Sequence, residues 1–378
     1  MFTIQDDPFY NELKRRVNTY LASDGRTRYA GPAMWAKSTF LIAAFFLLGA
    51  LVYCEKLSST AFVAVMALWM FNQFLMTIGI VHDAAHYCYA RSRKINRRMM
   101  YLFDLLGINS EHWIENHVHS HHGAPNVPLQ DSAIESFSLV RLHPKTKRNF
   151  ASKHQHLYIF AIYSVTTIFQ VYFLEFVSMA QGLVGFRLGG IRDALFFFAQ
   201  KMFVMSYSLL LPLWILPNPK SEILLGWVLG HMMCGIAIGI IFMTTHLHRD
   251  TEFIELTSDG LIQGTFATHI LRTTADVGTK NALYTWISGG LNLHVAHHLF
   301  PTISQIHLPA ITRIVRETAQ KHGVPYYEYT LWGALRSHVE LLKKLGNLPD
   351  WMSSDQETPK GASFELLESS QESQTVHA

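Results

Sequence analysis

The sequence is poor in charge and in cysteine. Asp, Glu, Lys and Arg make up 16% of its 378 residues, well below the roughly 25% that is usual in soluble domains. The net charge is only +3, and no basic run with interleaved aromatic residues is present, so nothing predicts a nucleic-acid partner. The three cysteines match neither a disulfide framework nor a zinc spacing. These absences exclude a disulfide-rich secreted domain and argue against a nucleic-acid-binding protein.

Apolar residues are plentiful instead, and they are gathered into long runs. They make up 49% of the chain. A helix needs about 20 largely apolar residues to cross the hydrocarbon core of a bilayer. Five stretches approach that length, at residues 35–53, 61–81, 157–179, 195–216 and 223–245. The polar N-terminal segment shows no pattern typical of a secretory signal. The sequence therefore predicts an all-α integral membrane protein with the lipid bilayer as a partner.

The number of crossings follows from parity. Histidine clusters follow the second and the fifth stretch, and clusters that share one site must lie on one face of the membrane. An even number of crossings must then separate them, although three apolar stretches lie between. The stretch 157–179 carries Gln170 and Glu175, and an acid at the centre of a span costs roughly 2.5–3.5 kcal/mol. We therefore predict four transmembrane helices in two hairpins, with 157–179 lying in the plane of the membrane or partly buried.

Basic residues predict the orientation. Lys and Arg are frequent before the first span and in the loop that follows the second, whereas the links on the other side contain only Lys56 and Lys220. The positive-inside rule places both termini and all the histidine clusters in the cytoplasm. The predicted divisions are an N-terminal segment at 1–34, a membrane domain at 35–346 with a cytoplasmic helical cap at 82–156 and 246–346, and a disordered polar tail at 347–378. Within the cap, 308–321 and 330–345 are predicted helices.

Three histidine boxes carry the chemistry. His82 and His86 have i, i+4 spacing, which places both rings on one face of a helix. His117 and His121 repeat this spacing, and on an α-helix His122 would point about 100° away, toward a second metal. The third box has i, i+3, i+4 spacing, and a ninth histidine ends the last span. The predicted metal ligands are His82, His86, His117, His121, His122, His246, His294, His297 and His298.

The size of this set restricts the kind of site. Imidazole suits Fe, Zn, Cu and Ni. A single zinc ion takes three or four ligands, so nine histidines fit two metals better. Carboxylates are scarce in the boxes, unlike the Glu-x-x-His pattern of soluble di-iron bundles. The segment from His82 to His86 is similar to a zinc-protease helix, but that interpretation leaves seven histidines unexplained. Asp83, Asp276 and Asn292 are candidates to orient imidazoles.

The boxes and their surroundings resemble the membrane fatty acid desaturase family. Residues 113–117 (WIENH) are similar to the Trp-x-x-x-His that leads into the second box of the family. Residues 288–301 contain its Gly-Gly-Leu-Asn and His-His-Leu-Phe-Pro block. Residues 314–318 and 323–326 resemble the C-terminal segment of bacterial linoleoyl-CoA, or front-end, desaturases. Two positions depart from the front-end pattern: His294 stands where Gln is usual, and Ala296 where an acid is common.

The resemblance implies a di-iron enzyme that uses O2 to introduce a cis double bond into a fatty acyl chain. The acyl group would be linked to CoA, a carrier protein or a phospholipid. The fused haem-binding donor domain, with its His-Pro-Gly-Gly segment, is not found in the sequence, so a separate ferredoxin or small haem cytochrome is expected to supply electrons. Two alternatives stay open at this point. One is a di-iron hydroxylase of an acyl lipid, alkane or other apolar substrate, and the other is a metal-binding or transport protein without catalysis.

Overall fold

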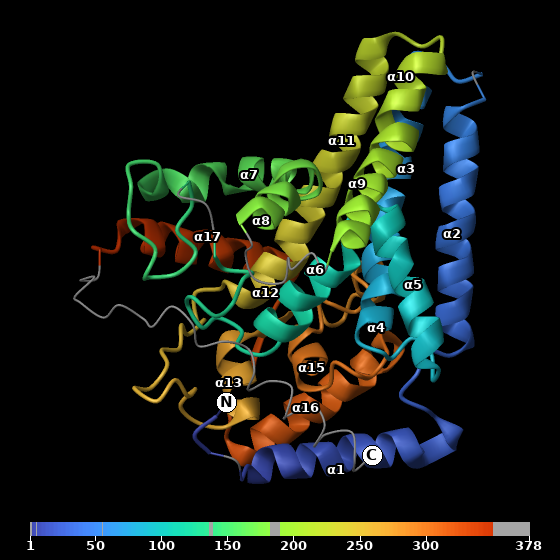
Figure 1. Cartoon of the computed structure of the whole chain (residues 1–378). Helices are drawn as coiled ribbons and strands as arrows, with labels where there is room; N and C mark the ends of the chain where they lie inside the picture. The colour runs from blue at the N-terminus through green and yellow to red at the C-terminus, as the bar shows by residue number, and fades with distance from the viewer. Residues whose placement is uncertain (1, 5, 55, 136–138, 182–189, 351–378) are drawn as a thin grey trace.

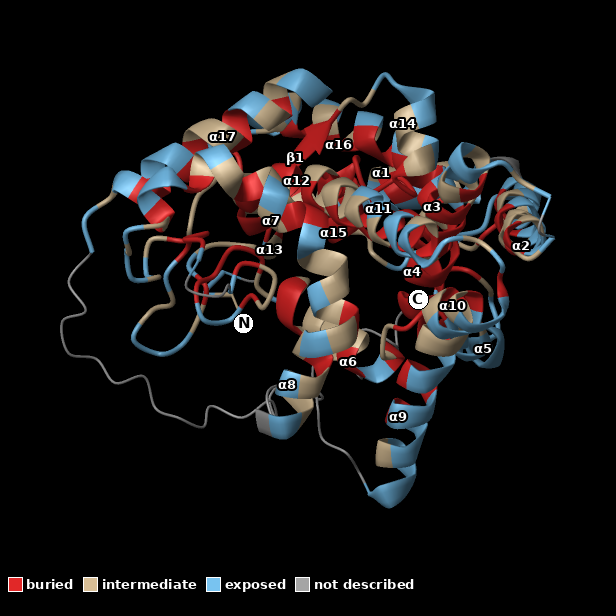
Figure 2. Ribbon diagram, turned by 90° about the horizontal axis from the view of Figure 1, so that it is seen from above, coloured by how far each residue is buried: buried red, intermediate tan, exposed pale blue. Residues whose placement is uncertain are grey.

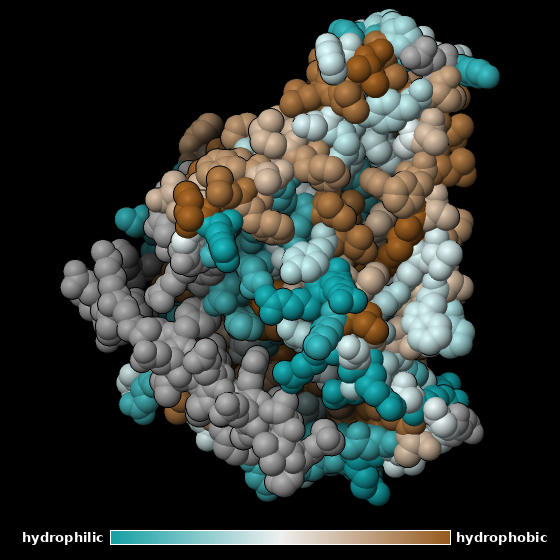
Figure 3. Space-filling model, turned by 45° about the vertical axis from the view of Figure 1, so that its right-hand side comes forward, coloured by the Kyte–Doolittle hydropathy of each residue, from teal (hydrophilic) through white to brown (hydrophobic). Residues whose placement is uncertain are grey.

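The computed structural model describes residues 2–350 except 5, 55, 136–138 and 182–189. Long helices form one end of the molecule, and shorter helices and loops form a cap at the other end (Figure 1). Brown apolar surface gathers over the end with the long helices, and teal hydrophilic surface over the cap (Figure 3). Buried residues concentrate around α4, α12, α15 and β1, whereas α2 and α9 are largely exposed (Figure 2). This distribution fits a membrane protein with a polar cap.

Within the described residues, five helices are long and apolar enough to cross a membrane. They are Pro32–Val52, Ser59–Ala85, Ser152–Ala180, Ile191–Ile215 and Lys220–His246. The first is the single helix α2. The others contain α3 (Ser59–Met76) and α4 (His82–Ala85); α7 (Gln155–Phe169) and α8 (Glu175–Gln181); α9 (Ile191–Met205) and α10 (Leu211–Ile215); and α11 (Lys220–Ile238) and α12 (Thr244–His246). Each of these four has a π-helical turn inside it, at Thr77–Val81, Gln170–Leu174, Ser206–Leu210 and Gly239–Met243.

The count of four spans is therefore not supported by length and composition, which also admit Ser152–Ala180. Glu175 does not exclude a crossing, because its charge is paired. Its carboxylate is buried against Lys201 of α9, with the Lys201 Nζ 2.7 Å from Glu175 Oε2, and it also accepts hydrogen bonds from the Asn109 N–H at 3.2 Å. A paired acid no longer carries the insertion cost of an isolated one. In Figure 1, however, α7 and α8 run across the direction of α2, α3, α9 and α11.

The cap is built from short elements. They are α1 (Pro8–Ala22), α5 (Arg93–Leu105), α6 (Ser110–Ile114), α13 (Phe266–Thr273), β1 (Ala275–Val277), α14 (Ala282–Ile287), α15 (His294–Leu299), α16 (Leu308–His322), β2 (Tyr327–Tyr329) and α17 (Leu331–Asn347). A π-helix continues α6 over Glu115–His121, and 3-10 turns lie at Ser23–Gly25, Ser152–His154 and Gln305–His307. The two strands pair in parallel, with Ala275 opposite Tyr327.

The two predicted cap helices are confirmed. The first is α16, which has Pro309 in its first turn and ends at Gly323, whose φ of 66° lies in the left-handed region that glycine adopts without strain. The second is α17, where the Thr330 side chain accepts a hydrogen bond from the Gly333 N–H. It continues to Asn347, two residues beyond the predicted end at 345. The tail predicted as disordered is 347–378: its first residue, Asn347, belongs to α17, and residues 351–378 lie outside the described residues.

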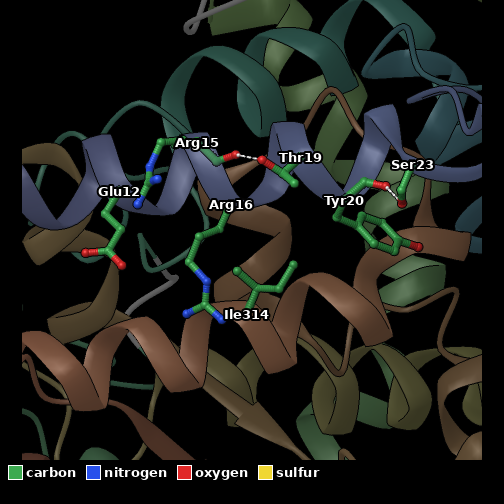
Figure 4. Close-up of a pocket in the computed structure, with 7 residues that line it drawn as sticks. All are labelled: Glu12, Arg15, Arg16, Thr19, Tyr20, Ser23 and Ile314. Atoms are coloured by element: carbon green, nitrogen blue, oxygen red, sulfur yellow. Dashed lines mark hydrogen bonds between the residues drawn. The ribbon is translucent and has the colours of Figure 1, made fainter.

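The helix α1 was not predicted. Its sequence signals are an N-cap at Asp7, whose side chain accepts from the Tyr10 N–H, and apolar residues at a spacing of four. These residues, Phe9, Leu13 and Val17, pack into one core cluster with α13, α15 and α16. A shallow groove of about 490 Å³ lies between α1 and α16, with Arg16 and Ile314 facing it (Figure 4). None of the predicted metal ligands lines this groove.

Candidate metal centre

All three histidine boxes and the end of the last long helix meet in the interior, at the junction of the long helices and the cap. The first box lies on α4 and the residue after it, the second on the π-helix after α6, and the third on α15. His246 ends α12. Eight of the nine predicted ligands fall into two groups of four. The first group is His82, His86, His117 and His297, and the second is His121, His246, His294 and His298.

Ligand atoms converge within each group. Each residue offers one ring nitrogen, and the four nitrogens of a group lie within 4.8 Å of one another. In the first group, the Nε2 atoms of His82 and His117 are 3.0 Å apart. In the second, those of His246 and His298 are 3.1 Å apart. Ligands about 2.1 Å from one ion, as in zinc–imidazole sites, are separated by about this distance. The spacing therefore fits nitrogens that surround a common ion.

The second box is divided between the groups, contrary to the prediction that His117 and His121 act on one metal. It is a π-helix rather than an α-helix, and the His122 N–H donates to the His117 carbonyl oxygen at 3.0 Å. In such a turn, residues five apart share a face. His122 accordingly lies beside His117, with 3.2 Å between their Nε2 atoms, whereas His121 belongs to the second group.

His122 occupies the space between the groups. Its Nε2 lies 3.0 Å from that of His297 in the first group, and its ring stacks on His298 of the second group at 4.2 Å between centroids. The third box is divided as well, since His297 belongs to the first group and its neighbours His294 and His298 to the second. A single centre with two parts therefore unites all nine predicted ligands.

Burial lowers the pKa of five of these imidazoles. Desolvation lowers the pKa of His294 to about 3. It is also the largest cause that depresses the pKa of His117, His122, His297 and His298 well below the usual value, followed by the neighbouring histidines. A histidine must be neutral to bind a metal. Four buried ring nitrogens find no hydrogen-bond partner among the described residues: His86 Nε2, His122 Nδ1, His294 Nε2 and His298 Nδ1. Imidazole-only groups with such free atoms fit a transition metal such as iron.

The residues predicted to orient imidazoles act elsewhere. Among the described hydrogen bonds, none joins Asp83, Asp276 or Asn292 to a ring of the nine histidines. Asp83 accepts from the Ser304 hydroxyl at 2.6 Å and so ties the first box to the segment after the third. Asp276 accepts from the Val295 N–H at 2.8 Å, at the start of α15, and burial raises its pKa to about 7. Asn292 donates to the Val277 carbonyl oxygen at 2.9 Å.

Other groups hold the rings, and little in the sequence indicates them. Asp131 Oδ1 lies 2.9 Å from His121 Nδ1. The Nδ1 of His246 lies 3.2 Å from the Thr273 carbonyl oxygen, and that of His294 lies 2.7 Å from the Leu291 carbonyl oxygen. Trp113 stacks on the His117 ring at 4.3 Å. Backbone oxygens leave no signal in a sequence, and Asp131 stands in a loop where an acid is an ordinary turn residue.

Two histidines outside the boxes form hydrogen bonds within the protein core. His338 Nδ1 donates to the Leu247 carbonyl oxygen at 2.7 Å, and its Nε2 lies 2.8 Å from the Tyr163 hydroxyl. His231 lies 3.1 Å from the Thr167 hydroxyl. These hydrogen bonds satisfy both ring nitrogens of His338 and the Nδ1 of His231. Neither residue belongs to a histidine group.

The fold and this centre define a class of protein: helical proteins with membrane-spanning character that hold a buried, two-part histidine centre. Within that class, the family described as "Fatty acid desaturase" matches residues 57–330. The chain belongs to this family. The match confirms the resemblance seen in the boxes, and the enzyme is an oxidoreductase that desaturates fatty acyl chains with O2. The zinc-protease and transport alternatives are not supported.

Relatives of known activity agree with the family match. An acyl-lipid (8-3)-desaturase of Physcomitrium patens is 29% identical over 349 residues, which cover 90% of this chain and 72% of the relative. An sn-1 linoleoyl-lipid 6-desaturase of a Synechocystis strain is 29% identical over 355 residues, covering 89% of this chain and 95% of the relative. The protein of the same name from Arthrospira platensis is 27% identical, with 93% and 96% covered.

Proposed function

We propose that the chain introduces a cis double bond into a lipid-linked acyl chain and uses two iron ions held by the nine histidines. One iron is bound by His82, His86, His117, His122 and His297. The other is bound by His121, His246, His294 and His298. The observation that carries this proposal is the convergence of eight ring nitrogens into two groups, with the Nε2 of His122 directed at the first.

The reaction needs metal chemistry because an unactivated C–H bond has no acidity that a side chain could exploit. When bound, the irons would supply the oxidising power drawn from O2. One hydrogen leaves each of two adjacent carbons, and O2 with two further electrons and two protons leaves as two waters. The protein fixes the imidazoles through Asp131 and the carbonyl oxygens of Thr273 and Leu291. Burial of the centre excludes bulk water.

We also propose four crossings, with both termini and the metal centre in the cytoplasm. The parity of the histidine clusters supports this topology. So does the direction of α7 and α8 across the other long helices (Figure 1). The Glu175–Lys201 pair then joins the in-plane helix to a true span. The bias of Lys and Arg in the connecting segments supports the orientation.

A lipid-linked substrate is supported by the names of the relatives, which are acyl-lipid and linoleoyl-lipid desaturases. Electrons would come from a separate ferredoxin or small haem cytochrome. The basic residues at and before the start of α5 are all exposed and would suit an acidic partner. They are Arg91, Arg93, Lys94, Arg97 and Arg98.

Expression in a host with a simple lipid profile tests the function. The wild type, supplied with an electron donor, should yield fatty acids with one additional double bond, and the new acids should appear in polar lipids before they appear in acyl-CoA. A variant with His297→Ala should yield none. Hydroxylated acids would indicate the hydroxylase instead. Unchanged lipids in the wild type, despite an active donor, would contradict the proposal.

A further inference from the structure

The loop that follows the second box contains a buried carboxylate that is fixed before it reaches a histidine. Asp131 is fully buried. Its Oδ2 accepts from the Asn126 N–H at 2.9 Å, and its Oδ1 accepts from the Ala133 N–H at 2.9 Å. The same Oδ1 lies 2.9 Å from His121 Nδ1. Two backbone donors thus orient the carboxylate, and the ring must present its Nδ1–H to it and its Nε2 to the rest of the group.

The side chain of Asn126 secures a second ligand of the same group. Its Nδ2 donates to the His246 carbonyl oxygen at 2.9 Å and to the Thr273 carbonyl oxygen at 3.0 Å. The Thr273 oxygen is also the partner of His246 Nδ1. Asn126 has a φ of 58°, a left-handed conformation that asparagine tolerates better than most residues. One loop therefore connects the second box, the end of the last long helix and the end of α13.

This support belongs to the second group alone. Among the described ion pairs and hydrogen bonds, His121 is the one histidine of the nine that meets a carboxylate. In the described part of the chain, the ligands of the first group contact other imidazoles and Trp113 but no acid. A carboxylate that accepts from a ligating histidine fixes its tautomer and makes it a more basic ligand. The two halves of the centre therefore differ in their electronic support.

We infer that Asp131 and Asn126 are positioning residues for the second histidine group and that they set its metal affinity separately from that of the first. This inference rests on the proposed metal centre. Removing such a partner typically weakens metal binding about 10- to 100-fold. The first group should keep its affinity, because neither residue contacts it.

Chelator competition on purified protein tests the inference. We expect Asp131→Asn to release one iron per chain at chelator concentrations about 10- to 100-fold below those needed for the wild type. The second iron should leave as it does in the wild type. Mössbauer spectra of the enriched protein should show which iron is lost as the disappearance of one of two components. Asparagine offers one acceptor oxygen where the carboxylate accepts from both Asn126 and Ala133, so the iron-free variant should also lose some stability. Selective loss of one iron is the result that a merely structural role would not predict.

Two further variants complete the test. Asn126→Gly removes both amide donors but keeps the left-handed backbone without strain, and it should also weaken one iron selectively. Asp7→Asn is the matched control: Asp7 is a buried carboxylate that accepts from the Tyr10 N–H, and among the described hydrogen bonds and ion pairs it meets none of the nine histidines, so it should leave both irons unchanged.

The outcomes separate the inference from the function. Iron absent from the wild type would overturn the metal centre itself. Two irons that leave Asp131→Asn and Asn126→Gly as they leave the wild type would overturn only the inference. So would equal weakening of both irons, or failure of both variants to fold while Asp7→Asn folds.

Discussion

His122 shows how much depends on the local geometry of a single turn. Its Nε2 lies 3.2 Å from that of His117 and 3.0 Å from that of His297, although an α-helix would have turned it away from His117. His119, from the same box, is partly exposed and lies 3.3 Å from Glu115. It belongs to neither group. The two residues are three positions apart and have opposite expected importance.

We expect His122→Ala to lower desaturation at least about 100-fold, the upper end of the effect of losing even an outer partner of a metal ligand. His119→Ala, the matched control, should stay within about twofold of the wild type. Product analysis of membranes with equal amounts of each variant checks both. Equal loss of activity in the two variants would mean that the box acts as a whole through its fold rather than through His122.

At the scale of elements, a close approach of backbones positions the third box. Gly289 precedes it with a φ of 63°, and a Cβ there would lie 2.3 Å from the Ile78 carbonyl oxygen. Ile78 belongs to the π-helical turn just before the first box. The approach of these two segments therefore brings the first and third boxes together, and only glycine allows it.

Gly289→Ala should lower stability by clearly more than the roughly 1–2 kcal/mol expected from a left-handed alanine, and it should also lower activity. Gly260 is the matched control, because it has a φ of 73° and a Cβ added there would meet nothing within 4 Å. Gly260→Ala should show the backbone cost alone. Thermal unfolding in detergent measures both. Similar losses for the two variants would contradict the role of the close approach.

The stability of the native protein should depend on pH through His338, a buried residue of α17. Burial lowers the pKa of His338 from 6.5 to about 4. Between these values the unfolded chain takes up a proton that the native chain does not, so native stability is lost as pH falls from about 6.5 to about 4. The loss amounts to about 3 kcal/mol from this group at 1.36 kcal/mol for each pKa unit.

Unfolding of the iron-free protein at pH 7.5 and pH 4.5 tests this dependence. His338→Gln keeps a group that can hydrogen bond but cannot be protonated, so it should lose less stability on acidification than the wild type does. His154→Gln, which changes an exposed ring, should behave like the wild type. An identical acid response in His338→Gln and the wild type would show that the ring does not titrate as its burial requires.

Many of the helices and the residues of the candidate site could be predicted from the sequence. The five apolar stretches, α16, α17 and the nine histidines follow from periodicity, capping residues and repeated spacing. The division of the second box between the two groups could not be predicted, because a π-helix and an α-helix share the same apolar pattern over so short a segment. The helix α1 was missed although Phe9, Leu13 and Val17 carry its signal. The pairing of β1 with β2 joins three residues from each of two distant segments, too few for a detectable alternation.

At the scale of the whole molecule, the arrangement of crossings decides whether one cytoplasmic face holds the centre. The charge of Glu175 alone does not show whether its helix crosses the membrane. Its partner Lys201 lies on a separate helix, and only the folded structure brings the two together. The parity of the histidine clusters does not depend on that charge. It requires that one of the three long helices between His82 and His246 does not cross.

Cysteine labelling in sealed vesicles tests the topology. Single cysteines at the exposed positions Phe150 and Arg192, one on each side of Ser152–Ala180, should react with an impermeant reagent from the same face, the cytoplasmic one. The exposed native Cys54 in the link between the first two spans should react only from the opposite face. Labelling of positions 150 and 192 from opposite faces would mean that Ser152–Ala180 crosses the membrane.

The most direct test of the two-part centre is the metal content of the purified, active wild type. Nine histidines that converge on one two-part centre predict about two iron ions per chain, with activity that falls as iron is removed and returns when iron is restored. One metal ion per chain at full activity, or full activity with no iron, would contradict the account.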